Sequence, residues 1–308
     1  MFDTDLFTIS GTLGVISTIS IVLGVSSLVA IYLLPHIMQL TPVILELLLY
    51  ATSCGLMWSD HYFNVSPYTQ LFFTFLGCVT LAPAVVFTLI QHVSKSSDFA
   101  VGIQTTSAVC SLIWGYQAIR LQSQLLGTFS IAALFTCLGF MIVILPFCYI
   151  VGFKNDAVML RTMNVTAYLI HAYAYAMFQG LENHSYFLPF RPGLLLLGGI
   201  VYFIGCLIIS NKYYSWREEK DTFRYIRCNF IAIGSGFAAL ALGSTLPALK
   251  YLQGLGGTFF LLLVVEKWIE IPWGEKYWAW GVTGFGVVMY GLVQWIHQHP
   301  EFVLGVPN

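Results

Sequence analysis

The feature that most constrains this chain is a series of long apolar segments joined by short connections. A helix needs roughly 20 apolar residues to cross the core of a bilayer. Ten segments meet that length, at about 10–34, 41–58, 70–91, 99–118, 125–152, 162–181, 193–211, 228–247, 252–268 and 277–297. Because helices satisfy their own backbone hydrogen bonds in lipid, the sequence predicts an all-α fold, a polytopic transmembrane bundle of about ten spans.

The composition agrees with lipid as the main surroundings of the chain. Only 9% of the residues are charged and 58% are hydrophobic, whereas a soluble domain carries about 25% charged residues. So little polar surface would not cover a globule of this size in water. The connections leave no room for a soluble domain, so residues 1–308 are expected to form a single membrane domain. The net charge of −1 and the lack of a basic arm argue against a nucleic-acid partner.

Weak internal matches indicate that the chain consists of two related halves, 1–158 and 159–308. Pro42 is followed by a glycine 13 residues later, and Pro192 is followed by a glycine at the same spacing. The glycines that match between the halves are Gly55 with Gly205 and Gly77 with Gly243. Five spans per half is an odd number, so the second half would be inverted in the membrane. A five-plus-five inverted repeat of this kind recurs among secondary transporters.

The distribution of basic residues predicts the orientation of the chain. The connections after odd-numbered spans hold ten of the thirteen Lys and Arg residues, and the other connections hold three. Those three residues are Arg120, Arg191 and Lys250. Since cytoplasmic loops carry the excess of Lys and Arg, we expect both termini on the extracytoplasmic side of an integral membrane protein.

Glu46 is the most conspicuous residue of the second predicted span, which reads TPVILELLLY around it. It lies roughly 7 Å from the cytoplasmic end of the span at 1.5 Å per residue. An ionised acid near the bilayer centre costs on the order of 3 kcal/mol, and less near the edge. We therefore expect Glu46 to meet a group in the bundle interior, as a protonated hydrogen-bond donor, a proton carrier, one half of an ion pair or a structural contact.

A polar stripe follows the sixth predicted span. Its five residues succeed one another at steps of 4, 3, 4 and 4, which places them on one face of an α-helix, and they are Asn164, Tyr168, His171, Tyr175 and Gln179. Such a face should avoid lipid and line either a wet cavity or a contact between helices. His171 lies near the middle of the span, and an imidazole there can exchange a proton near neutral pH. Inter-helix hydrogen bonding is the structural alternative.

These features favour a secondary transporter or permease for a small molecule, with proton coupling as one version. Glu46 and His171 would be the protonatable pair, and the stripe of the sixth span would line the path. The alternative is a non-catalytic subunit that scaffolds or senses within a larger complex, with membrane-protein partners. No cofactor is indicated, and an enzyme is the less favoured class.

A membrane-embedded, metal-dependent hydrolase is the remaining alternative. Imidazoles and carboxylates on the outer face could hold zinc, and the residues concerned are Asp60, His61, Glu182, His184, His297, His299 and Glu301. They come from three separate segments without the spacing of a known zinc motif. The sequence therefore assigns no metal ligand and no catalytic residue.

Overall fold

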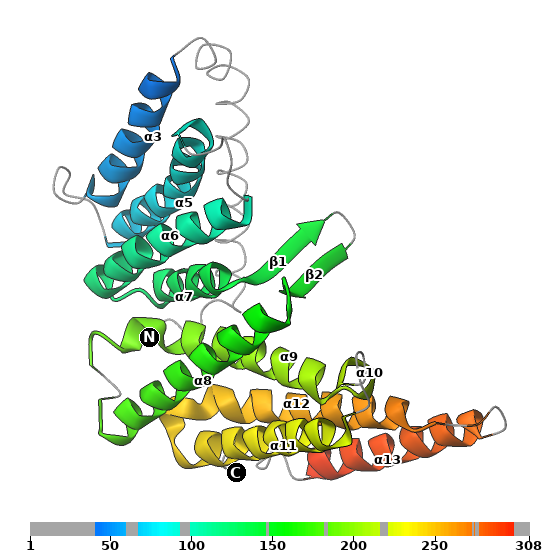
Figure 1. Cartoon of the computed structure of the whole chain (residues 1–308). Helices are drawn as coiled ribbons and strands as arrows, with labels where there is room; N and C mark the ends of the chain where they lie inside the picture. Colours follow the sequence, from blue (N-terminus) through cyan, green and yellow to red (C-terminus); the bar gives the residue numbers. More distant parts are fainter. Residues whose placement is uncertain are drawn as a thin grey trace.

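The structure is a computed structural model, and it describes residues 41–59, 67–92, 99–145, 148–181, 184–215, 221–272, 274 and 277–298. These residues are predominantly helical, so the predicted helical class is confirmed for them (Figure 1). The first predicted span, 10–34, lies outside the described residues, as do both termini. The predicted side of the termini therefore stays a prediction.

The described part of the first half contains four helices: α3 (Pro42–Met57), α5 (Pro67–His92), α6 (Phe99–Leu121) and α7 (Gln124–Leu138). Each packs against the next, α3 on α5, α5 on α6 and α6 on α7. Proline opens α3 and α5, where its missing N–H costs nothing. The Ser123 side chain accepts a hydrogen bond from Leu126 N–H and so caps α7.

The predicted fifth span, 125–152, is wrong as a single helix. α7 ends at Leu138, and Gly139 has a φ of 101°, a left-handed conformation that ends helices and that glycine adopts at little cost. The chain then forms an antiparallel hairpin of β1 (Phe140–Leu145) and β2 (Cys148–Phe153). Hydrophobicity alone did not distinguish the two structures, because a short apolar run rich in β-branched residues suits a strand as well as a helix.

Where the structure describes the second half, it contains five long helical segments and several short ones. They are α8 (Asp156–Phe178), η3 (Leu188–Phe190), η4 (Gly193–Leu197), α9 (Gly198–Ser210), α10 (Lys212–Ser215), α11 (Thr222–Thr245), η5 (Pro247–Leu249), α12 (Lys250–Glu270) and α13 (Trp278–Gln298). α9 contacts α8, α11 and α12, so it is the central helix of this half (Figure 1).

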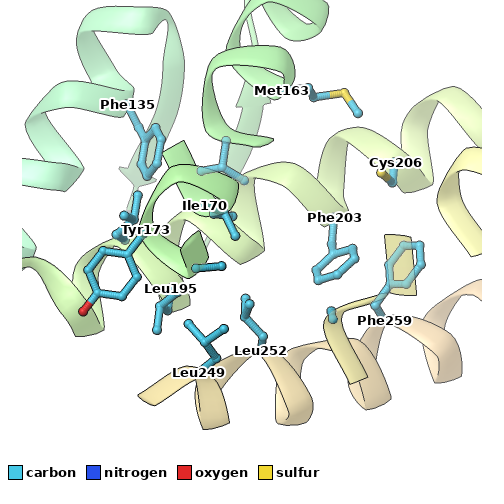
Figure 2. Close-up of a cluster of buried hydrophobic side chains, with 14 of the residues drawn as sticks. Phe135, Met163, Ile170, Tyr173, Leu195, Phe203, Cys206, Leu249, Leu252 and Phe259 are labelled. Atoms are coloured by element: carbon cyan, nitrogen blue, oxygen red, sulfur yellow. The ribbon is translucent and has the colours of Figure 1, made fainter. Parts of the chain in front are cut away.

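The main core lies around α9 and extends to α7 (Figure 2). Phe203 of α9 stacks on Phe259 of α12, with ring centroids 4.5 Å apart. Leu195 and Leu249 are fully buried, and Phe135 of α7 is 1% exposed in the same cluster. This cluster joins the two halves, because Phe135 belongs to the first and the other four to the second.

Four helices in the described residues are long and apolar enough to cross a membrane, namely Tyr68–Gln91, Leu188–Ser210, Thr222–Thr245 and Pro247–Glu270. α3 and α7 are apolar but shorter. The outer surface of α11 is apolar as well, since Phe230 and Phe237 are 72% and 62% exposed. Lipid is the solvent that suits such a surface, so the chain is an integral membrane protein. The number of ten spans stays a prediction.

The glycines that match between the predicted halves have different packing roles. A Cβ on Gly77 would meet Ser53 and Met57 of the preceding helix α3, whereas one on Gly243 would meet Gln253 of the following helix α12. Gly55 has no neighbour within 4 Å of that position, while Gly205 faces Met163. The inverted repeat therefore rests on the sequence alone.

Gly77→Ala should weaken the α3–α5 contact, because the added Cβ would lie 2.9 Å from Met57 N and 2.8 Å from Ser53 O. We expect a loss of about 1–3 kcal/mol in stability, measured by thermal unfolding in detergent. Gly55→Ala is the matched control, since open space surrounds that position. Equal stability of the two variants would contradict the close contact.

Candidate functional site

The face of α3 that packs on α5 carries three polar side chains. Four residues at steps of 4, 3 and 4 form this face: Glu46, Tyr50, Ser53 and Met57. The opposite face is apolar and exposed, with Leu47 and Leu48 at 65% and 48%. Glu46 therefore points to the helix pair and away from the lipid-facing side, as predicted for an interior partner.

Thr88 of α5 is the partner that Glu46 meets. Its hydroxyl donates to Glu46 Oε1 over 2.6 Å, and the Tyr50 hydroxyl lies 3.0 Å from Thr88 Oγ1. Thr88 Oγ1 also lies 3.1 Å from the carbonyl oxygen of Ala84, one turn earlier in α5. Because a hydroxyl has one proton to donate, the Thr88 hydroxyl donates to either Glu46 or the Ala84 carbonyl oxygen at any one time.

Gln117 of α6 is a buried polar residue that the sequence interpretation missed. It is 0% exposed, and neither atom of its amide has a hydrogen-bond partner among the described residues. Thr74 of α5 is also 0% exposed, and its hydroxyl has no partner there either. Buried polar groups in native proteins almost always have a partner, often an ordered water. The sequence could have indicated Gln117, because it is the one Asn or Gln residue in the segment 105–121.

The packing of α5 on α6 places Thr74 at the level of Gln117. Trp114 Nε1 donates to the Cys78 carbonyl oxygen over 3.0 Å, and Leu81 packs in one cluster with Cys110. The two helices therefore run antiparallel, so residue numbers fall along α5 as they rise along α6. One turn beyond the Cys78–Trp114 contact, Thr74 lies at the same level as Gln117. From this register we infer that the two unpartnered groups lie near each other, close to the end of α6.

The polar stripe lies on the outer face of α8. All five of its residues are exposed, and Tyr168 and Tyr175 reach 76% and 67%. His171 Nδ1 lies 2.7 Å from the Ala167 carbonyl oxygen of its own helix. Buried residues such as Met163, Ile170 and Met177 occupy the other face. The first four residues therefore share one face of α8 and Gln179 follows at its C-cap. The described residues leave this face open where an interior position was expected, and its role in a transport path stays a prediction.

Glu46 and the stripe are not brought together in the described part of the chain. α3 packs on α5 and α8 packs on α9, and Figure 1 shows α3 and α8 in different halves of the molecule. The predicted pairing of Glu46 with His171 has no contact to support it.

A second polar cluster joins the ends of α9, α11 and α12. Lys267 Nζ donates to Glu270 Oε2 over 2.9 Å and to the Ser210 carbonyl oxygen over 2.6 Å. The Tyr225 hydroxyl donates to Glu270 Oε2 over 2.6 Å, and the backbone N–H of Lys212 donates to the other carboxylate oxygen. This network fastens three helix ends to one another and covers the carbonyl end of α9.

Metal chemistry has no support in the described residues, which contain no group of three or more His, Cys, Asp or Glu able to hold an ion. Most of the candidate metal ligands predicted for the outer face lie outside the described residues. They are Asp60, His61, Glu182, His299 and Glu301. His184 stacks on Tyr186, with ring centroids 5.2 Å apart.

No family model, no curated protein and no solved structure matches this chain. The function therefore has to be argued from the polar groups themselves.

Lys267→Met should destabilise the joined helix ends, because Glu270, with a side chain only 5% exposed, would lose its cation. Removing one partner of a buried ion pair costs about 3 kcal/mol or more, and thermal unfolding in detergent measures it. Lys250→Met, at the exposed start of the same helix, is the matched control and should leave stability unchanged. A Lys267→Met protein as stable as this control would show that the Lys267–Glu270 network does not stabilise the contact between these helix ends.

Proposed function

We propose that this chain is a multi-pass membrane protein that transports a small polar solute, with a proton carried at Glu46. The observation that carries the proposal is the hydrogen-bond chain from Tyr50 through Thr88 to Glu46, within a helix pair whose outside is apolar. A carboxyl group at membrane depth is costly and is typical of ion and proton pathways. The proposal does not depend on the lack of a metal-binding group among the described residues.

The geometry around Thr88 suits a group that gains and loses a proton. Ionised Glu46 accepts the Thr88 hydroxyl proton, and Thr88 accepts that of Tyr50. Protonated Glu46 can instead donate to Thr88 Oγ1, while the Thr88 hydroxyl turns to the Ala84 carbonyl oxygen 3.1 Å away. Both states keep their hydrogen bonds, so a proton can bind with little more than rotation of one hydroxyl group.

Gln117 and Thr74 are the proposed contacts for the solute. An amide and a hydroxyl offer both hydrogen-bond donors and acceptors. Within the described residues, neither the Gln117 amide nor the Thr74 hydroxyl forms a hydrogen bond. Each buried group of this kind costs about 1–3 kcal/mol until a partner arrives. A polar solute or a water molecule between α5 and α6 would remove that cost, and Glu46 and Gln117 would then stand near opposite ends of one path.

The test is solute uptake by the full chain in liposomes under an imposed pH gradient, with a mixture of small polar solutes followed by mass spectrometry. Glu46→Gln should abolish the dependence of uptake on the gradient, because the amide cannot carry the proton. Thr88→Val should reduce it, since Glu46 loses its donor. Thr80→Val is the matched control, because its hydroxyl bonds only within α5, to the Gly77 carbonyl oxygen.

Gradient-driven uptake that survives Glu46→Gln would remove the proposed role of Glu46. A wild-type protein that takes up no solute from the mixture, with or without a gradient, would count against transport itself. Correct folding of each variant is checked by its elution as a single species in detergent.

A second candidate function is that of a non-catalytic membrane subunit, and the open face of α8 favours it. Tyrosine, histidine and amide side chains do not suit lipid, and they can form hydrogen bonds to a neighbouring helix. The expected occupant is a transmembrane helix of a partner protein with polar residues of its own. The role of Asn164, Tyr168, His171, Tyr175 and Gln179 in lining a transport path stays a prediction, as the described residues leave this face open.

Photo-crosslinking from position 168 distinguishes these readings. With Tyr168 replaced by p-benzoylphenylalanine in the native membrane, the subunit hypothesis expects one partner protein at fixed stoichiometry. The same label at Tyr116, which is exposed on α6 at 57%, serves as the control. A crosslink within the chain, to residues 10–34, would instead make the α8 face an internal contact.

A further inference from the structure

A surface cavity of about 380 Å³ lies where the chain passes from α12 to α13. The residues that line it are Trp268, Pro272, Gly274, Tyr277, Trp280, Gly281 and Gly284. It lies apart from the proposed transport residues, which belong to α3, α5 and α6. The cavity needs an explanation of its own.

Aromatic rings and bare backbone form the walls of this cavity. Trp268 comes from α12, Tyr277 precedes α13 and Trp280 lies in its first turn. Trp268 is held by Phe285, with ring centroids 5.5 Å apart. Gly281 and Gly284 present no side chain, and a Cβ on Gly284 would lie 4.0 Å from the Trp268 ring. The missing side chains on α13 are what leave the space between the rings.

The position of the cavity along α12 corresponds to lipid headgroups. The apolar segment Pro247–Glu270 ends at the Lys267–Glu270 pair, and the lining continues beyond it with Pro272 and Gly274. Tryptophan and tyrosine gather at this depth in membrane proteins. Lys267 and Glu270 bond to α9 and α11 and do not line the cavity. The described lining is therefore aromatic and uncharged, so its attraction for a cation comes from the rings.

We propose that this cavity binds the choline headgroup of phosphatidylcholine, with the quaternary ammonium against the rings of Trp268, Tyr277 and Trp280. Aromatic faces attract cations, and quaternary ammonium groups are recognised in this way. The primary ammonium of phosphatidylethanolamine is more strongly hydrated, so it loses more on leaving water. An anionic headgroup such as phosphatidylglycerol offers the rings no cation.

The test is native mass spectrometry of the full chain, purified in detergent and mixed with equal amounts of the three lipids. We expect phosphatidylcholine to be retained several-fold more than phosphatidylethanolamine or phosphatidylglycerol. Trp280→Ala should reduce that retention by roughly two- to fivefold, because a cation–π contact at an exposed ring is worth about that factor. Trp280 is 75% exposed, so the fold should tolerate its loss.

Gly284→Leu tests the cavity without removing a ring, because the leucine side chain would fill the space beside Trp268. Gly286→Leu on the same helix is the matched control, since no atom lies within 4 Å of that Cβ position. We expect the first variant to lose phosphatidylcholine and the second to retain it. If the Gly284→Leu protein does not fold, lipid retention by the Trp280→Ala protein tests the proposal.

Three results would overturn the proposal. One is equal retention of phosphatidylglycerol and phosphatidylcholine, and another is unchanged retention in the folded Trp280→Ala or Gly284→Leu protein. The third is displacement of the lipid by free choline at the lipid's own concentration, which would assign the site to a soluble ligand. None of these results depends on whether the chain transports a solute.

Discussion

The need of charged side chains for partners away from lipid shapes two of the helix contacts in this structure. A carboxylate or ammonium that faces hydrocarbon costs about 3 kcal/mol or more, so both charged groups discussed above lie where helices meet. Glu46 is met by Thr88 between α3 and α5, and Lys267 joins Glu270 to the end of α9. These contacts join α3 to α5 in the first half and the ends of α9, α11 and α12 in the second.

The contact between the halves follows a different rule, that of close backbone approach. A Cβ on Gly127 of α7 would run into the backbone of Pro189, and one on Gly193 would meet the Thr128 backbone of α7 at 2.7 Å. Small residues allow helices in membranes to approach in this way. Phe135 then reaches into the main core from α7 (Figure 2). The joint thus combines apolar packing with hydrogen bonds from Arg161 and Thr162 of α8 to the Leu138 carbonyl oxygen at the end of α7.

This division separates the proposed activities in space. The groups suited to protons and polar solutes lie in the first half, while the aromatic cavity suited to a lipid headgroup lies at the far end of α12. The outward face of α8 is a third feature, and its polar side chains favour an occupant other than lipid. A transporter with bound lipid and a membrane subunit with a partner helix are both consistent with such a layout, and α8 is where they differ.

The sequence by itself determined the helical class, the membrane location and the periodicity of the α8 stripe, because hydrophobicity and the 3.6-residue repeat are local properties. It also singled out Glu46, since a lone acid in an apolar run is conspicuous. It did not separate the hairpin after Gly139 from the helix before it, because the apolar composition continues through both. Only the tertiary structure decided that Thr88 meets Glu46 and that, among the described residues, the stripe faces outward and Gln117 is buried without a partner. Those outcomes depend on which helices become neighbours, and packing between distant segments, rather than any local pattern, selects the neighbours.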